Sequence, residues 1–244
     1  MSDSIRDVNK RIIVALDFPN RAKADECLLK LQGQVSYVKV GMELFYAEGP
    51  GFVSSLKERG FQVFVDLKVH DIPNTAKGAI RSLARLGADM VNVHAAGGLA
   101  MMEAAREGLE QGTPAGAPRP LLIGVTMLTS TSQETMNRDI KIAGTVEEAV
   151  LHYAATAKKA GLDGVVASPL EVPRLKTELG APFLTVTPGI RPKGADQGDQ
   201  TRITTPEEAF KLGSDYIVIG RALTAAADPS IAWQSMMDAL RVQL

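Results

Sequence analysis

An acid and a base stand two residues apart at the end of an apolar run, because Asp66 and Lys68 follow Val63, Phe64 and Val65. In a β-strand, residues i and i+2 point to the same face, so the run predicts that the two charged side chains lie side by side. Burying such charges costs several kcal/mol unless they are paired. A strand that keeps both at its end is therefore expected to build a site for acid–base chemistry.

Ionisable residues with alternating charge also stand at the ends of other apolar runs. The set is Asp17, Lys39, Asp66, Lys68 and Arg221, with Asp71 at the turn after the third run. A structural network of ion pairs would explain any one of them, but a whole set at one face favours catalysis. Two carboxylates beside Lys68 would keep its ammonium form favoured. This predicts a proton donor, since a nucleophilic lysine needs a lowered pKa.

The second half of the chain carries two Gly–Arg signals, Gly189-Ile190-Arg191 and Gly220-Arg221, after its last two apolar runs. In a barrel, this is the usual position of a phosphate site, where backbone amides meet the anion. Arg221 would add a bidentate clamp. Turn glycines with surface arginines are the alternative. The polar residues 191–203 predict either a mobile lid or an ordinary exposed loop.

Eight short apolar runs must position these residues. They occupy residues 12–16, 37–40, 63–67, 90–93, 121–125, 164–167, 183–186 and 216–219. Their length and β-branched content are typical of buried parallel strands. Helical spacing of apolar residues follows in 22–31 and 75–86, and Thr145 and Thr205 have the surroundings of helix caps. Strand–helix alternation predicts a single (β/α)8 barrel domain over residues 1–244. A doubly wound sheet is the rival, but no Gly-x-Gly-x-x-Gly follows the first run.

The composition excludes several classes of protein. The chain has 244 residues and a net charge of −1, so it offers no electrostatic case for binding nucleic acid or an anionic membrane. No apolar run approaches the ~20 residues of a membrane span, and the first residues lack the apolar core of a signal peptide. These features predict a cytoplasmic protein. The single cysteine, Cys27, rules out an internal disulfide and is expected to be a buried thiol.

The histidines and carboxylates do not predict a metal site. His70 is expected to turn away from Lys68, His94 to support the mouth through a hydrogen bond, and His152 to lie on a helix surface. No His-rich or Cys-rich spacing typical of a metal occurs. Inward carboxylates could hold Mg²⁺, but the adjacent lysines compete for them, so no metal is expected.

Five segments of the chain, taken in order, resemble the bacterial type of the orotidine 5′-phosphate decarboxylase family. They are Ala15-Leu16-Asp17, Lys39-Val40-Gly41, the run from Asp66 to Thr75 (Asp-Leu-Lys-Val-His-Asp-Ile-Pro-Asn-Thr), Pro188-Gly189-Ile190-Arg191 and Gly220-Arg221. The resemblance spans nearly the whole expected barrel. It implies release of CO2 from orotidine 5′-monophosphate (OMP) to give UMP, the last step of de novo pyrimidine synthesis. It also implies a homodimer that needs no cofactor.

The resemblance assigns roles to individual residues. Lys68 is expected to protonate C6, with Lys39, Asp66 and Asp71 completing a charged tetrad in which Asp71 reaches the partner's site. The implied substrate-binding residues are Asp17, Lys39, Asp66, Asp71, Ile72, Thr75, Thr129, Pro188, Arg191, Gln200, Gly220 and Arg221. Asp17 and Lys39 would bind ribose hydroxyls, Thr75 would help from across the interface, and Thr129 would contact the pyrimidine. Gln200 and Arg221 would hold the phosphate, with Arg191 at the base of the lid.

Three other functions remain open from the sequence. A Mg²⁺-dependent phosphosugar decarboxylase or synthase would share the Asp-x-Lys-x-x-Asp motif of residues 66–71. A Schiff-base aldolase would use a lysine as nucleophile. A catalytically silent barrel that binds phosphorylated metabolites is the alternative outside the enzymes.

Overall fold

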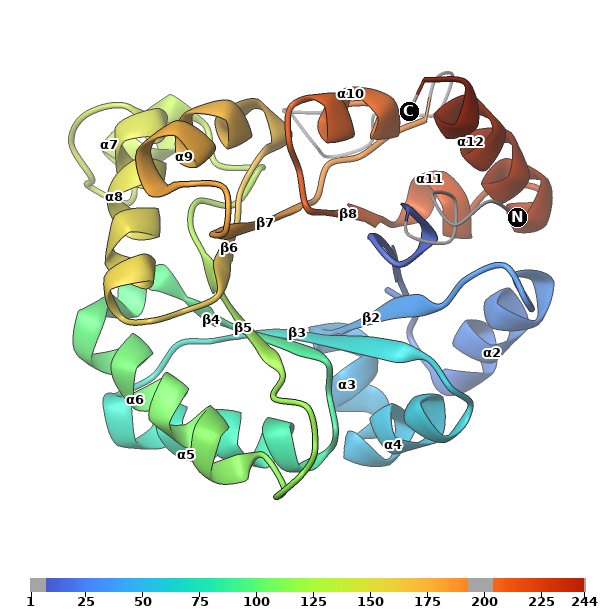
Figure 1. Ribbon diagram of the computed structural model, residues 1–244, viewed down its shortest axis with the longest axis horizontal. Helices are drawn as coiled ribbons and strands as arrows, with labels where there is room; N and C mark the ends of the chain where they lie inside the picture. Colours follow the sequence, from blue (N-terminus) through green and yellow to red (C-terminus); the bar gives the residue numbers. More distant parts are fainter. Residues whose placement is uncertain (1–7, 193–203, 244) are drawn as a thin grey trace.

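The chain forms a closed barrel of eight parallel strands (Figure 1). The structure, a computed structural model, describes residues 8–192 and 204–243. The strands are β1 Ile12–Ala15, β2 Tyr37–Gly41, β3 Gln62–Val69, β4 Met90–His94, β5 Leu121–Val125, β6 Gly164–Val166, β7 Leu184–Thr187 and β8 Tyr216–Ile219. Each strand pairs with its neighbours in chain order, and β1 pairs with β8 to close the barrel. The predicted (β/α)8 barrel is confirmed, and the doubly wound sheet is excluded.

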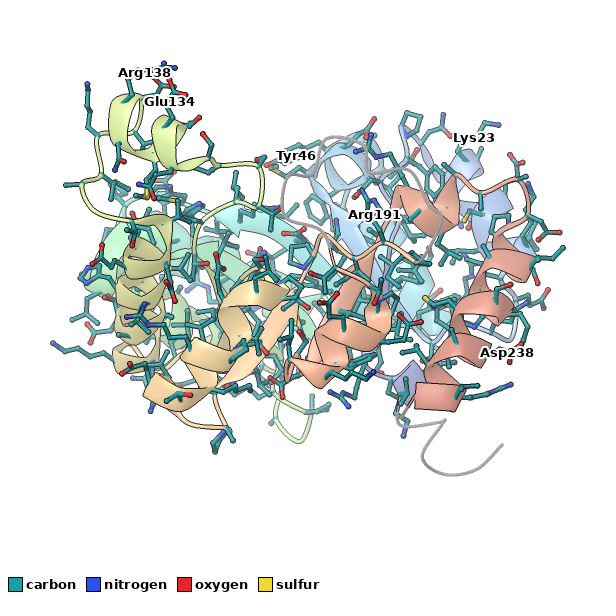
Figure 2. The ribbon with its side chains drawn as sticks, turned by 90° about the horizontal axis from the view of Figure 1, so that it is seen from above. Lys23, Tyr46, Glu134, Arg138, Arg191 and Asp238 are labelled. Atoms are coloured by element: carbon teal, nitrogen blue, oxygen red, sulfur yellow. The ribbon has the colours of Figure 1, made fainter. Side chains whose placement is uncertain are left out.

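Helices alternate with the strands and surround the barrel (Figure 1). They are α2 Arg21–Lys30, α3 Met42–Glu48, α4 Pro50–Glu58, α5 Pro73–Arg85, α6 Gly98–Gly112, α7 Gln133–Arg138, α8 Val146–Lys159, α9 Val172–Leu179, α10 Pro206–Lys211, α11 Arg221–Thr224 and α12 Pro229–Gln243, with short 3-10 turns at Ala95–Gly97 and Pro169–Glu171. The helices predicted at 22–31 and 75–86 are confirmed as α2 and α5. Figure 2 shows α7, which carries Glu134 and Arg138, projecting at the end of the barrel where Arg191 lies.

The barrel interior is closed below its mouth by a compact apolar cluster. Its buried members are Ile13, Ala15, Tyr37, Phe64, Met90, Ile123, Val186 and Val218. Because side chains alternate along a strand, the residue two places after Phe64 also points inward. That residue is Asp66, so the floor of the mouth is apolar and the charged groups stand directly on it. A second, larger cluster fills the space between the strands and the helices.

Three aspartates secure the opposite end of the barrel, each just before an even-numbered strand. These basal aspartates are Asp89, Asp163 and Asp215, which pair with Lys57, Arg119 and Lys176 and accept the backbone N–H groups of Val63, Leu122 and Thr185. Each N–H belongs to the strand that precedes the aspartate. Side chains at the N-terminal face of such a barrel typically serve stability, so the basal aspartates join β3 to β4, β5 to β6 and β7 to β8.

Helices α5 and α6 pack unusually closely, because α6 has glycines where the two cross. A Cβ added to Gly108 would stand 2.2 Å from the carbonyl oxygen of Lys77, and one added to Gly112 would stand 2.3 Å from that of Arg81. Such distances leave no room for any side chain. The contact holds α5 against α6 at Lys77 and Arg81, in the middle of the helix that follows the loop with Asp71.

The helix ends agree with the signals in the sequence. Thr145 forms the predicted capping box with Glu148, and the Thr205 side chain accepts from the backbone of Glu208. Glycine is the residue type that commonly ends helices, and Gly60, Gly87, Gly161 and Gly213, which stand between a helix and the next strand, all have a left-handed φ between 75° and 98°. Cys27 is buried, as expected. Across residues 8–192 and 204–243, no helix is both long and apolar enough to span a membrane.

Candidate active site

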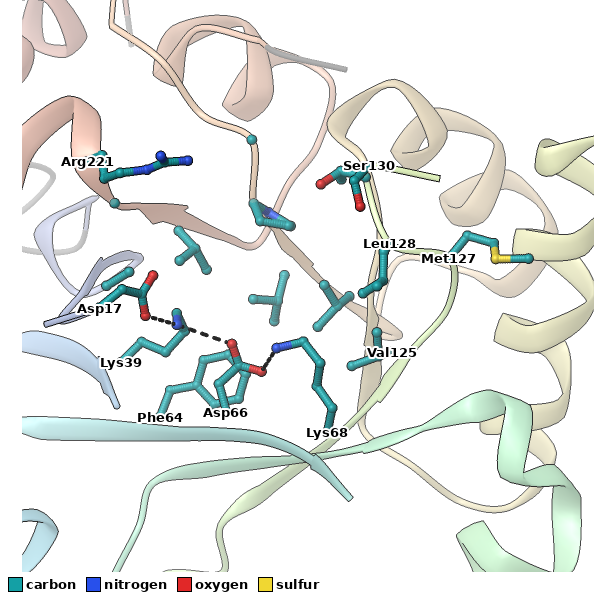
Figure 3. A pocket seen from close by; sticks show the side chains of 18 of the residues that line it. Asp17, Lys39, Phe64, Asp66, Lys68, Val125, Met127, Leu128, Ser130 and Arg221 are labelled. Carbon is teal, nitrogen blue, oxygen red and sulfur yellow. Dashed lines mark hydrogen bonds and ion pairs between the residues drawn. The ribbon is translucent and has the colours of Figure 1, made fainter. Parts of the chain in front are cut away.

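A cavity of about 290 Å³ opens at the C-terminal ends of the strands (Figure 3), where barrel enzymes place their active sites. Its volume lies near the lower end of the range for small-molecule pockets, about 300–1,000 Å³. Nine of the residues predicted for the site line it, namely Asp17, Lys39, Asp66, Lys68, Thr129, Pro188, Arg191, Gly220 and Arg221. The structure therefore brings most of the predicted residues to one place.

Four charged side chains form a continuous chain along one wall of the cavity (Figure 3). Lys39 Nζ lies 2.9 Å from Asp17 Oδ1 and 3.2 Å from Asp66 Oδ2, and Lys68 Nζ lies 2.8 Å from Asp66 Oδ1. The side chains of Lys39 and Asp66 are 9% and 11% exposed, whereas that of Lys68 is 28% exposed. Lys68 is therefore the lysine whose ammonium group reaches most openly into the cavity.

Lys39 and Asp66, the two buried members of this row of charged side chains, remain charged. Burial alone would lower the pKa of Lys39, but the adjacent carboxylates of Asp66 and Asp17 outweigh it and raise that pKa. Burial would likewise raise the pKa of Asp66, but Lys39, Lys68 and hydrogen bonds from Lys68 and Asn92 lower it. At neutral pH, Asp66 is thus a carboxylate held between two cations. The site presents fixed charges to a ligand.

Gly41, at the end of β2, lets Asp17 and Lys39 meet. A Cβ at this position would stand 2.8 Å from Asp17 Oδ1 and 3.1 Å from Lys39 Nζ. The sequence shows Gly41 only as part of a motif, and nothing in its spacing reveals this role.

Gly41→Ala is therefore expected to displace the half-exposed Asp17 side chain and to break its contact with Lys39. Because Asp17 can swing into solvent, the melting temperature should stay within about 3 °C of wild type, since a loss below ~0.5 kcal/mol shifts it little. The KM for substrate should rise about tenfold, the equivalent of one charge-assisted hydrogen bond. Steady-state kinetics beside a thermal melt provide the measurement, and an unchanged KM would contradict the role given to this contact.

The part of the cavity predicted to bind an anion lies across from Lys68, where Arg221 begins α11 (Figure 3). Arg191 follows β7 and is 9% exposed, and Gly189 has a left-handed φ of 78°. Ile190 pairs with Thr204, so the two ends of the predicted lid come together beside the cavity. Residues 193–203 of that lid, including Gln200, lie outside the described residues, and their predicted roles stay predictions.

The remaining wall is largely apolar. It combines Val125 and Leu128 with Val166, Val186 and Val218, and the buried Thr129 adds a hydroxyl among them. Figure 3 shows Val125 and Leu128 beside the ammonium end of Lys68. A planar ring could lie against this wall with one edge facing that ammonium group.

Three predicted residues lie outside the cavity lining of the single chain. Asp71, Ile72 and Thr75 are all exposed, and the Ile72 side chain is 68% exposed, a high value for a large apolar residue. Asp71 Oδ1 accepts from the backbone N–H of Ile72. Of the two carboxylates expected beside Lys68, one chain places Asp66 there and turns Asp71 outwards. The predicted roles of Asp71, Ile72 and Thr75 require a second subunit and stay predictions.

The histidines flank the mouth without lining it. His70 and His94 stack with ring centroids 5.4 Å apart, and His94 Nδ1 accepts from the backbone N–H of Ala96. Burial, His70 and Lys68 together lower the pKa of His94. His152 is exposed on α8, as expected. Within the described part of the chain, no three His, Cys, Asp or Glu side chains gather as metal ligands would.

Fold and site together define the class: a (β/α)8 barrel whose mouth holds an array of paired acids and lysines, with two arginines across the cavity from them. Residues 10–236 match the family model described as "Orotidine 5'-phosphate decarboxylase / HUMPS family". Curated orotidine 5′-phosphate decarboxylases from Bacillus cytotoxicus and Bacillus cereus are 55% and 54% identical over 229 residues, covering 94% of this chain and 96% of each relative.

Solved structures give the same result. A crystal structure of orotidine 5′-phosphate decarboxylase from Lactobacillus acidophilus matches with a TM-score of 0.84 at 42% identity, covering 94% of this chain and 98% of that one. An uncharacterized conserved protein from Geobacillus kaustophilus matches with a TM-score of 0.83 at 51% identity, covering 94% and 99%. The chain belongs to the orotidine 5′-phosphate decarboxylase family, as its motifs predict.

Proposed function

We propose that the chain converts OMP to UMP and CO2, with Lys68 stabilising the charge that develops on C6 and then protonating it. As a member of its family, the chain is a carboxy-lyase of pyrimidine biosynthesis. The observation that carries the mechanism is the position of the Lys68 ammonium group, which stands in the cavity 2.8 Å from Asp66 and beside an apolar wall. This is an arrangement for donating a proton to a carbon atom of a ring.

The chemical difficulty is the carbanion. When the bond between C6 and the carboxyl carbon breaks, CO2 leaves and the electron pair stays on C6 in the plane of the ring, where the π system cannot delocalise it. For slow reactions, enzymes lower the barrier by roughly 20 kcal/mol. A preorganised ammonium group meets the developing charge without reorganising, and its proton then forms the new C6–H bond. Solvent returns a proton to the neutral amine of Lys68.

The other residues bind and orient the nucleotide. Asp17 and Lys39 bind the ribose hydroxyls, and Thr129 contacts the pyrimidine, which rests on the apolar wall with Pro188 and Gly220 nearby. Arg191, Arg221 and Gln200 hold the phosphate. Because the phosphate is remote from C6, its binding energy acts by closing residues 191–203 over the site and excluding water. Asp66 stands near the departing carboxylate and aims Lys68.

The active form is a homodimer in the cytoplasm, in which the partner subunit supplies the second carboxylate of the site. The exposure of the run that contains Asp71, Ile72 and Thr75, beside the mouth and with an apolar side chain at its centre, supports this assembly. An outward carboxylate and an outward isoleucine are better explained by a contact between subunits than by solvent.

The test is whether the purified protein converts OMP to UMP in buffer without added metal. The reaction is monitored by the loss of the orotate absorbance. Turnover is expected to be undiminished by EDTA. Activity that EDTA abolishes and Mg²⁺ restores would favour a Mg²⁺-dependent phosphosugar decarboxylase or synthase. A covalent adduct between a lysine and the substrate, trapped by borohydride, would favour a Schiff-base aldolase. Absence of turnover with OMP would overturn the proposal.

A further inference from the structure

Strand β3 leaves its regular ladder with β4 at the residues that carry the site. Val65 pairs with Val91, but Val69 pairs with Val93, so three residues of β3 face one residue of β4. Within this irregular stretch, Lys68 has a left-handed φ of 49°. For a non-glycine residue this conformation is sterically unfavourable, so it persists only where neighbouring contacts impose it. Some group must therefore hold the backbone of Lys68.

The single residue opposite this stretch is Asn92, whose side chain is completely buried. Its Oδ1 accepts the backbone N–H of Lys68 at 2.8 Å. In a regular ladder a main-chain carbonyl would accept that hydrogen bond. The asparagine amide takes its place, so Lys68 can depart from strand geometry without leaving a buried N–H unsatisfied.

The other end of the same amide acts on the acid of the site. Asn92 Nδ2 donates to Asp66 Oδ1 at 2.7 Å. The same oxygen accepts from Lys68 Nζ, while Asp66 Oδ2 faces Lys39. These contacts prevent the Asp66 carboxylate from rotating, because one of its oxygens contacts Lys68 and the other contacts Lys39. Asn92 thus contacts both the backbone of Lys68, the proton donor, and the carboxylate of Asp66, which orients the Lys68 side chain. Asn92 itself does not line the cavity.

We propose that Asn92 is a positioning residue of the decarboxylase, which holds Lys68 in its left-handed conformation and locks the Asp66 carboxylate so that the ammonium group points at C6. The inference rests on the proposed function, because it concerns the same proton donor. It assigns a role to Asn92, a polar residue in the middle of an apolar strand and outside the cavity lining.

The first variant, Asn92→Leu, has similar size and removes both hydrogen bonds. We expect kcat to fall about 100-fold, the effect of misplacing a catalytic group by roughly 1 Å. The KM for OMP should stay within about threefold of wild type, because position 92 lies outside the cavity lining. The matched control is Thr185→Val, which removes a fully buried hydroxyl that donates to the basal aspartate Asp215. That control should lower the melting temperature and leave kcat within about threefold.

The second variant, Asn92→Asp, separates positioning from a structural role by its pH profile. The protonated carboxyl has the shape and the hydrogen-bonding pattern of the amide, since its O–H can donate to Asp66 and its carbonyl can accept from Lys68. The ionised carboxyl cannot donate and repels Asp66, so the two acids share one proton. As the pH rises and this proton leaves, the kcat of the variant relative to wild type is expected to fall about 100-fold.

Few charged or titratable side chains lie near position 92. Asp66 and Lys68 face it from β3, Lys39 follows behind Asp66, and His94 lies two residues along β4. On the other side, β5 contributes Ile123 as the residue paired with Asn92. Dividing by the wild-type profile removes the titration of the groups that both proteins share, so the remaining pH dependence belongs to the new carboxyl and Asp66.

The outcomes separate two failures. If wild type releases no CO2 from OMP, the proposed function fails. If wild type is active and Asn92→Asp keeps a kcat near wild type with a parallel pH profile, the positioning role is wrong. Should Asn92→Leu prove unfolded in a thermal melt, the Asn92→Asp profile decides alone, because the protonated variant keeps both hydrogen bonds.

Discussion

Lys68→Ala is expected to lower kcat by at least about 10⁴-fold while the barrel stays folded. Electrostatic stabilisation of a developing anion by one donor typically contributes about 10²–10³-fold, and general acid catalysis about 10²–10⁴-fold, and this one amine supplies both. The side chain is 28% exposed and already lines the cavity, so its removal widens that opening and leaves no new void in the apolar core. The measurement is single-turnover release of CO2 from OMP, with a melt to check the fold.

The matched control is Lys141→Ala. Lys141 is the other non-glycine residue with a left-handed φ in the described part of the chain, at 65°, and it is exposed and away from the cavity. The two substitutions therefore share their backbone cost, and only one removes an amine from the site. Near-normal turnover in Lys68→Ala would end the assignment of this residue as the acid.

Mixing two inactive variants should restore about a quarter of the wild-type activity. Asp71→Asn and Lys68→Ala are each expected to be nearly inactive alone. In a dimer that exchanges subunits at random, half of the assemblies contain one copy of each. If Asp71 serves the partner's site, one of the two sites in such a mixed dimer has both native residues, and the other lacks both. One site in about four is then complete.

The control mixture combines Lys68→Ala with Lys39→Ala. Both lysines act within their own subunit, since they contact the same Asp66. A mixed dimer of these variants has one defect in each site, so no activity should return. Activity should therefore be assayed in both mixtures after incubation under conditions that allow exchange. Equal recovery, or none with Asp71→Asn, would contradict a shared site.

The sequence alone predicts the fold almost completely, for a physical reason. Buried parallel strands must be apolar on both faces, and helix ends need particular residues, so both leave local signals. The capping box at Thr145 and the left-handed glycines lie where those signals place them. Local patterns do not show that two helices, α3 and α4, follow β2, or that α7 interrupts the path from β5 to α8. The extra helices have the same local spacing of apolar residues as the helices of the regular strand–helix units. That spacing therefore does not show where an additional helix is inserted.

The site was predicted less completely, because part of it depends on contacts between strands. Alternation along β3 places Asp66 and Lys68 together, as the structure confirms. The same rule fails to foresee the left-handed backbone of Lys68, because lysine has no preference for it. Asn92 stands out in the sequence as a polar residue at the end of an apolar run, but its role comes from the register of β4 against β3, which the sequence does not show. The rule also gives no role to Gly41, whose value lies in the side chain it lacks.

The basal aspartates have a consequence for dividing the protein into two pieces. Asp89 and the strand it secures lie before residue 113, whereas Asp163, Asp215 and their partners, including Arg119, lie after residue 117. A cut at 114–117 therefore leaves each of these contacts inside one fragment. Asp17, Lys39, Asp66 and Lys68 fall in the first fragment, and Arg191 and Arg221 in the second. Neither fragment can bind and transform a nucleotide alone, so attaching the two to interacting proteins would turn CO2 release into a reporter of their association.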